Sequence, residues 1–253
     1  MKTKFAQQLV ADFWERVGSE EPFPRHLERS IMSTAPVFVI KVHRQRLDTT
    51  YIRNRLQQRG VHLPTAWADR RLNGCLVAYR GEAALFVDGT LPADETRVII
   101  AHEFGHYLGE YEWPRLRALR SLGDKILDVL DGTRAPTRNE LISATLTQVH
   151  VGVYVHYMDR STRGGSGFLV TEVEETANVI ASELLAPRQI VLGQIARSNN
   201  GHSREAIVHM LRSQFGLATP FAEWYAERLA MQLRKRRSFS DILGFEARKA
   251  MKS

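Results

Sequence analysis

The sequence is poor in cysteine and contains no long apolar run. Its single cysteine, Cys75, excludes an internal disulfide and lies in an apolar stretch, which predicts simple burial. No run of about 18 apolar residues occurs, so we expect no transmembrane helix. Asp12 and Glu15 interrupt the segment after the basic residues Lys2 and Lys4, and no apolar signal-peptide core forms there. We therefore expect a cytoplasmic protein.

The composition is that of an ordinary globular protein. With 43% hydrophobic and 25% charged residues, the 253-residue chain has enough apolar side chains for a sizeable core, which excludes a disordered or fibrous protein. The net charge of +7 permits contact with nucleic acid but does not require it. Much of the excess lies in the basic run Arg234 to Arg237, for which a solvated helix end is the simpler interpretation.

Hydrophobic periodicity and turn residues predict an α+β fold. The expected helices are 4–17, 48–59 (with Asp48 as N-cap), 93–109, 114–131, one starting at the capping box Thr137 to Glu140, 172–186, and 188–237 with a break at 215–217. The expected strands are 36–42, 74–79 and 83–87 (the last two joined as a hairpin), 149–157, and 168–170 after the Gly/Ser-rich loop 161–167. We expect a small, largely antiparallel sheet beside helix 93–109, followed by a mostly helical second half.

The expected helix 93–109 carries an HExxH motif. Residues four apart lie on one helical face, so His102 and His106 can both reach one zinc ion. Glu103 would lie beside the metal as the acid/base carboxylate. Gly105 costs helix stability, about 1 kcal/mol against alanine, which makes sense if another element packs closely there. The alternative is a chance HExxH on a surface helix.

A catalytic zinc usually has a third protein ligand, and the helix 172–186 offers one. Glu174 and Asn178 lie four apart on one face, so Glu174 could bind the metal while Asn178 accepts a hydrogen bond from the other ring nitrogen of His102. Glu172 and Glu175 are rival ligands. The alternative is a set of surface carboxylates that complement the helix dipole.

The run VIIAHEFGHYL over residues 98–108 and the run EETANVIASELLAP over residues 174–187 resemble the two motif helices of the ImmA/IrrE family of metallopeptidases. The resemblance covers about residues 35–235 and is specific only in these two helices. It implies a zincin-like fold in which His102, His106 and Glu174 bind Zn²⁺ and Glu103 is the catalytic acid/base. It also implies a bacterial regulatory protease that cleaves a helix-turn-helix repressor or a similar protein, in stress response or mobile DNA.

One departure from the family concerns the connection between the motif helices, where 67 residues (107–173) separate His106 from Glu174. We interpret 113–171 as an insertion into a single domain spanning 1–253. The other parts are the N-terminal helix 4–17, the sheet and HExxH helix 35–110, the third-ligand helix 172–186 and the helical C-terminal part 188–253.

An amide hydrolase also needs a donor for the developing oxyanion. Alternation along the expected strand 149–157 places His150, Tyr154 and His156 on one face and Tyr157 on the other. Of these, His156 and Tyr154 are our candidates, against the alternative that they are ordinary core residues. The remaining histidines without a partner at ligand spacing are predicted to be structural or surface residues: His43, His62, His202 and His209.

Three functions are compatible with these patterns. The first is a zinc-dependent, site-specific endopeptidase. The second is a DNA-binding regulator that uses a helix-turn-helix-like pair, 203–214 and 219–237, although Phe221, Trp224, Tyr225 and Leu229 have the spacing of core contacts. The third is a metal-stabilised interaction module without turnover, which a fourth protein ligand would favour.

Overall fold

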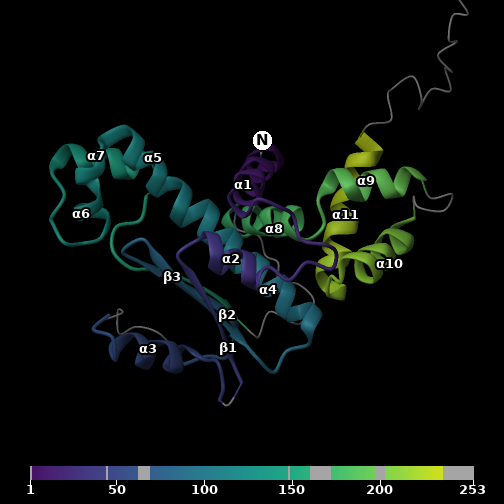
Figure 1. Ribbon diagram of the computed structural model, residues 1–253, viewed down its shortest axis with the longest axis horizontal. Helices are drawn as coiled ribbons and strands as arrows, with labels where there is room; N and C mark the ends of the chain where they lie inside the picture. Colours follow the sequence, from purple (N-terminus) through teal and green to yellow (C-terminus); the bar gives the residue numbers. More distant parts are fainter. Residues whose placement is uncertain are drawn as a thin grey trace, which may run out of the picture.

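The computed structural model describes residues 2–43, 45–61, 69–147, 149–159, 172–197 and 203–235. Within these residues the fold is α+β, with a four-stranded mixed sheet and helices on both of its faces (Figure 1). No described helix is both long enough and apolar enough to cross a lipid bilayer. The predicted α+β class with a small sheet is therefore confirmed.

The sheet contains the three strands expected beside helix 93–109 and, as a fourth, part of the strand predicted over 149–157. Its spatial order is β1 (Val37–Val42), β3 (Glu82–Asp88), β2 (Leu72–Tyr79) and β4 (Tyr154–Asp159). β2 pairs antiparallel with both β3 and β4, whereas β1 runs parallel to β3. The segment expected to be an insertion thus supplies an edge strand of the main sheet.

The predicted hairpin forms between β2 and β3, with Glu82 paired in β3 and not in the connection where it was expected. Arg80 and Gly81 both have positive φ, 53° and 84°, which a two-residue type I′ turn requires. This tight turn fixes the register in which Cys75 lies opposite Phe86. The two strands therefore form a rigid, buried centre of the sheet.

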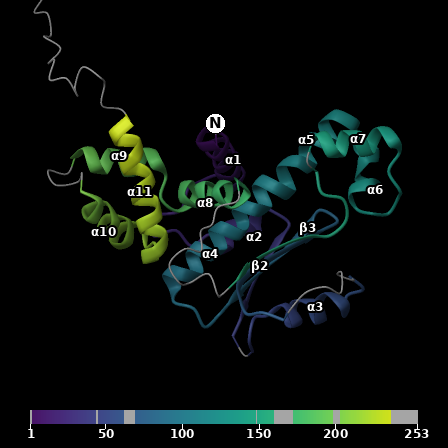
Figure 2. The same cartoon turned by 180° about the vertical axis from the view of Figure 1, so that it is seen from behind.

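The two faces of the sheet are covered differently. One face packs against α1 (Lys2–Val17), α2 (Glu28–Thr34), α4 (Ala93–His106) and α8 (Glu172–Leu185) in the main apolar core (Figures 1 and 2). The other face packs against α3 (Thr49–Gln57), which Asp48 caps by accepting a hydrogen bond from the Tyr51 amide at 2.7 Å. Cys75 is fully buried on this second face, as predicted.

The chain after α4 differs from the single helix predicted over 114–131. A π-helical turn, Tyr107–Glu112, leads into α5 (Trp113–Leu122), and Gly123 with φ of 76° then ends the helix. A 3₁₀ turn (Asp124–Ile126), the short α6 (Leu127–Leu130) and α7 (Arg138–Thr147) follow. The break at Gly123 was not predicted, because a lone glycine does not by itself end a helix.

The capping box before α7 forms as predicted. The Thr137 amide donates to Glu140 Oε2 at 2.7 Å, and the Glu140 amide donates to Thr137 Oγ1 at 3.3 Å. This α5–α7 group lies at one end of the molecule (Figure 1).

The strand predicted from Val149 begins only at Tyr154, so its first five residues were assigned wrongly. Gly152 adopts a positive φ of 83° and its amide donates to the Leu130 carbonyl, which keeps the preceding residues out of the sheet. The predicted partner strand 168–170 and the loop 161–167 lie outside the described residues.

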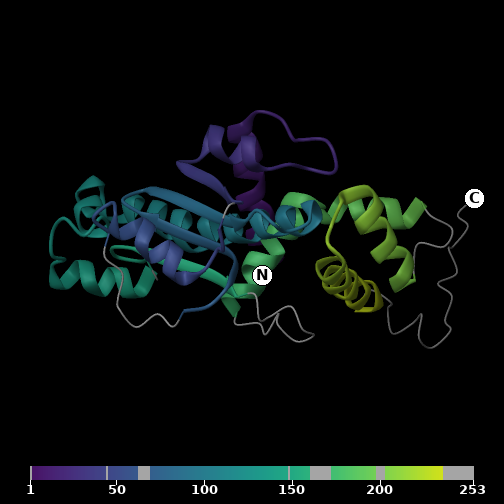
Figure 3. The same ribbon diagram turned by 90° about the horizontal axis from the view of Figure 1, so that it is seen from below.

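The C-terminal part is a group of three helices at the opposite end of the molecule (Figure 3). These are α9 (Arg188–Arg197), α10 (Arg204–Phe215) and α11 (Thr219–Lys235), with Gly216 in the left-handed conformation between the last two. Phe221, Tyr225 and Leu229 are buried and Trp224 packs against the same core, as their spacing predicts. The end of the basic run, from 236 onward, lies outside the described residues.

Candidate metal centre

The HExxH motif lies in the interior of the protein. α4 is enclosed between the sheet and α8, and His102, Glu103 and His106 are 1%, 0% and 0% exposed. Burial of three ionisable side chains is costly unless each has a polar partner or a metal ion. The motif therefore does not lie on a surface helix, as the alternative interpretation assumed.

Two glycines allow the surrounding elements to approach α4 closely. A Cβ atom at Gly105 would lie 2.8 Å from the Ala177 carbonyl oxygen of α8, a distance that real contacts do not show. A Cβ atom at Gly74 on β2 would lie 2.5 Å from the Ile99 side chain and 3.2 Å from that of Glu103. The close packing inferred from Gly105 in the sequence is thus confirmed.

His102 and His106 are each oriented through the ring nitrogen Nδ1. His102 Nδ1 lies 2.9 Å from Asn178 Oδ1, and His106 Nδ1 lies 2.6 Å from Glu110 Oε1. Both partners are acceptors, so each Nδ1 carries the proton and each Nε2 presents a lone pair. The two Nε2 atoms are 3.0 Å apart, an arrangement that favours a cation bound by both.

Glu174, at the start of α8, faces these histidines. Its Oε2 atom lies 3.3 Å from His102 Nε2 and 3.8 Å from His106 Nε2. The two rival carboxylates point elsewhere: Glu172 pairs with Lys2, and Glu175 pairs with Lys2 and Arg228. The structure therefore brings together the ligand set that the sequence predicts.

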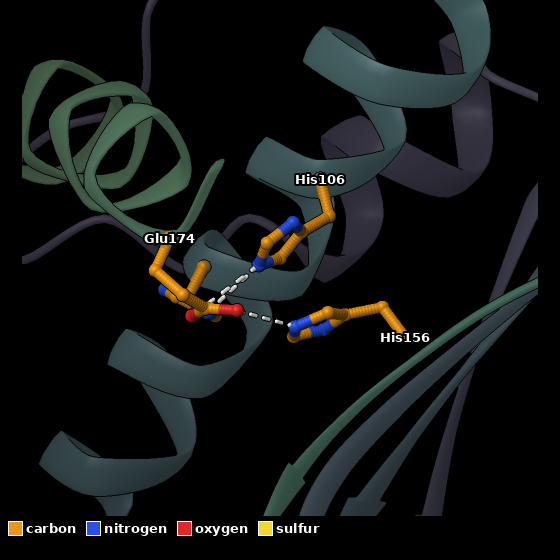
Figure 4. A group of neighbouring side chains, drawn as sticks. His106, His156 and Glu174 are labelled. Carbon is orange, nitrogen blue, oxygen red and sulfur yellow. Dashed lines mark hydrogen bonds and ion pairs between the residues drawn. The ribbon is translucent and has the colours of Figure 1, made fainter. Parts of the chain in front are cut away.

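His156 enters the site from β4 on the opposite side (Figure 4). Its Nδ1 atom lies 2.9 Å from Glu103 Oε2, and its Nε2 atom lies 2.9 Å from Glu174 Oε1. Because both ring nitrogens face carboxylates, the ring can donate two hydrogen bonds as an imidazolium. His156 is thus bonded in a different way from His102 and His106.

Tyr154, two residues earlier on β4, directs its hydroxyl away from this centre. The hydroxyl donates to Glu110 Oε2 at 2.7 Å, and the ring packs against that of His150 at 4.7 Å between centroids. Tyr154 and His156 share a face of the sheet, whereas Tyr157 packs on the other face, as alternation predicts.

Opposite charges in the site raise the pKa of His156 and lower the pKa values of Glu103 and Glu174. Burial and the loss of hydration would lower the pKa of His156, but Glu103 and Glu174 outweigh this and raise it to about 10. Burial would raise the pKa of Glu103, yet His156 holds it below its usual range. The pKa of Glu174 is likewise lowered, against the effect of burial, by its contacts with the imidazoles of His102, His106 and His156. The carboxylates are therefore ionised and suited to bind a cation.

The side chains fit a metal ion. One ligand atom from each of His102, His106, His156 and Glu174 lies within 4.8 Å of the others. Glu103 Oε1 is buried beside them and has no hydrogen-bond partner among the described residues. Two imidazoles and a carboxylate are a ligand set that Zn²⁺ accepts, although these contacts do not identify the metal.

Comparison of the chain with protein-family models and with curated proteins found no match.

Glu110 is a site residue that the sequence analysis missed. It follows His106 by four residues, and this spacing places both side chains on one helical face, so the pattern HxxxE was a usable signal. The predicted structural or surface histidines that the structure describes, His43 and His209, are not in the metal cluster. His62 and His202 lie outside the described residues.

Proposed function

We propose that this protein is a zinc-dependent endopeptidase with a zincin-like centre. The observation that carries the proposal is the convergence of two imidazole Nε2 atoms and Glu174 from separate helices, with the free Oε1 of Glu103 beside them. Zn²⁺ held by His102, His106 and Glu174 would polarise the scissile carbonyl and lower the pKa of water. The resemblance of α4 and α8 to the ImmA/IrrE motif helices points to the same chemistry.

Glu103 is the acid/base of the proposed reaction. Its Oε1 atom accepts the proton of the attacking water, and the same carboxyl then donates that proton to the leaving amine nitrogen. Its other oxygen, Oε2, is held by His156 Nδ1 at 2.9 Å. This hydrogen bond fixes the carboxylate so that one defined oxygen atom moves the proton.

His156 has a second part in the proposal. Its imidazolium lies between Glu103 and Glu174, so a positive hydrogen-bond donor is available where negative charge develops on the carbonyl oxygen. The arrangement supports His156 over Tyr154 as the oxyanion donor, because His156 belongs to the ligand cluster itself whereas the Tyr154 hydroxyl donates to Glu110.

The substrate class rests on the resemblance alone. We infer a regulatory protease that cleaves a transcriptional repressor or a similar protein partner in the bacterial cytoplasm. A repressor encoded beside the gene is the first candidate substrate.

The test pairs metal analysis with one isosteric substitution. Purified protein is loaded with Zn²⁺ and incubated with candidate repressors, and cleavage is followed by mass spectrometry. Glu103→Gln should retain one zinc per chain and lose cleavage by at least about 100-fold, because the amide cannot accept the proton. Glu205→Gln, on the exposed start of α10, is the control and should cleave normally.

Cleavage that persists in Glu103→Gln would overturn the acid/base assignment. A wild-type protein that takes up no metal would overturn the proposal as a whole.

A non-catalytic metal-stabilised module is the second candidate function. It is favoured by the position of His156 Nε2, which lies close enough to the cluster to serve as a fourth protein ligand. Four protein ligands would close the coordination sphere, as in structural zinc sites. X-ray absorption spectra of the zinc-loaded wild type and of His156→Ala distinguish the two: loss of one imidazole scatterer on substitution favours the module.

A further inference from the structure

The carboxylate of Glu110 occupies a place between the metal centre and the β4 strand. Its Oε1 atom lies 2.6 Å from His106 Nδ1, and its Oε2 atom accepts the hydroxyl proton of Tyr154 at 2.7 Å. Both oxygens of one side chain are thus used, one toward α4 and one toward the sheet. The side chain of Glu110 is only 22% exposed, so these contacts are largely shielded from water.

The π-helical turn Tyr107–Glu112 is the backbone feature that carries Glu110. The Trp113 amide bonds the Leu108 carbonyl, five residues back, which is the wider spacing of a π-helix. Such turns are rare and are frequently found at functional sites. The same turn directs Tyr111 inward, where its hydroxyl oxygen accepts a hydrogen bond from the Gly81 amide at 2.8 Å. It directs Glu112 outward, where the carboxylate pairs with Arg16.

Tyr154 in turn is fixed by the sheet. It is 6% exposed, and it lies opposite Ala78 in the β2–β4 ladder. Its hydroxyl therefore reaches Glu110 from a rigid position. The chain of contacts runs from β4 through Tyr154 and Glu110 to the Nδ1 atom of His106.

We propose that Glu110 is the positioning residue of His106 and that Tyr154 acts through it, so that the segment between the two motif helices sets the geometry of the metal centre. Glu110 has the same relation to His106 that Asn178 has to His102, because each supplies an acceptor for Nδ1–H. A fixed Nδ1–H directs the Nε2 lone pair and raises the basicity of the ring as a ligand. The inference rests on the proposed metal site.

The experiment measures metal affinity in full-length protein, with Zn²⁺ in competition against a chromophoric chelator. Glu110→Ala should weaken Zn²⁺ binding by about 10- to 100-fold, the usual effect of removing such a partner. Glu110→Gln retains an acceptor oxygen, as Asn178 does for His102, and should recover most of the affinity. The absorption spectrum of bound Co²⁺ should shift in Glu110→Ala and stay close to wild type in Glu110→Gln.

Tyr154→Phe tests the second half of the chain of contacts. It should weaken Zn²⁺ binding less than Glu110→Ala does. The double variant should bind no more weakly than Glu110→Ala alone, because Tyr154 acts only through the carboxylate. The control is Glu112→Ala in the same π-helical turn, which breaks the ion pair with Arg16 and should leave Zn²⁺ affinity unchanged.

Thermal unfolding of the metal-free proteins distinguishes a merely structural role. A structural role would lower the melting temperature of Glu110→Ala without changing the affinity of the folded protein, which would overturn the inference. Additive effects of Glu110→Ala and Tyr154→Phe would overturn the part played by Tyr154. If wild type binds Zn²⁺ and Glu110→Ala binds it equally well, only this inference fails; if wild type binds none, the proposed function fails with it.

Discussion

The histidines of α4 and the histidine of β4 lie in the same cluster but are held in different ways. His102 and His106 each have Nδ1 on an acceptor and Nε2 directed toward Glu174, whereas His156 has both nitrogens on carboxylates. The first arrangement suits a metal ligand, and the second suits a cationic hydrogen-bond donor. Residue type and proximity therefore do not define a role; the hydrogen-bond partners of each nitrogen do.

The largest expected effect is the loss of zinc binding when a histidine of α4 is replaced. His102→Ala or His106→Ala should abolish stoichiometric Zn²⁺ binding, because a single imidazole with Glu174 is a weak site. Zinc content after dialysis, measured by inductively coupled plasma mass spectrometry, should fall from about one per chain to near zero, given the three-ligand requirement. His209→Ala, at an exposed position of α10, is the matched control. Retention of zinc by either variant would contradict the assignment of His102 and His106 as metal ligands.

The next largest effect is expected on turnover, when the histidine of β4 is replaced. His156→Ala should keep its zinc and lose turnover by about 100- to 1000-fold, as when an oxyanion donor is removed. Kinetics on a cleaved repressor together with zinc content give both quantities. Loss of zinc in this variant would mean that His156 is a fourth metal ligand, with the same role as His102 and His106.

A smaller effect is expected from widening the gap between the two motif helices. Gly105→Ala places a methyl group against the Ala177 carbonyl, and overpacking of this kind costs about 1–3 kcal/mol. Urea unfolding of the metal-free protein measures this cost. Gly109→Ala meets only the flexible end of Ile180, at 3.2 Å, and should cost less. Equal stability of the two variants would contradict the close approach of α4 and α8.

The smallest effect is expected on the local stability of α7, which lies far from the metal centre in the segment 113–171. Thr137→Ala removes the N-cap of α7 and should cost about 1 kcal/mol locally. Amide hydrogen exchange should increase in 138–142 while Zn²⁺ affinity stays at the wild-type value. A lower affinity would mean that the α5–α7 group is coupled to the metal centre beyond the contact through Tyr154.

Local patterns predicted the parts of the fold whose signals lie close together in the chain. The Asp48 cap, the β2–β3 hairpin and the Thr137–Glu140 capping box each depend on residues within a few positions. All three form, the hairpin with a turn one residue shorter than expected. The break at Gly123 and the late start of β4 were missed. The late start of β4 depends on a contact with a distant residue, the bond from the Gly152 amide to the Leu130 carbonyl, whereas a lone glycine such as Gly123 does not by itself signal a helix end.

The sequence by itself determined that His102, Glu103 and His106 share one helix, and that Glu174 and Asn178 share another, because helical spacing fixes which side chains lie on one face. Only the tertiary structure decided that His156 joins them and that Glu110 is shared with Tyr154. Those contacts depend on the pairing of β4 with β2 and on a π-helical turn, which arise from packing between segments far apart in the chain.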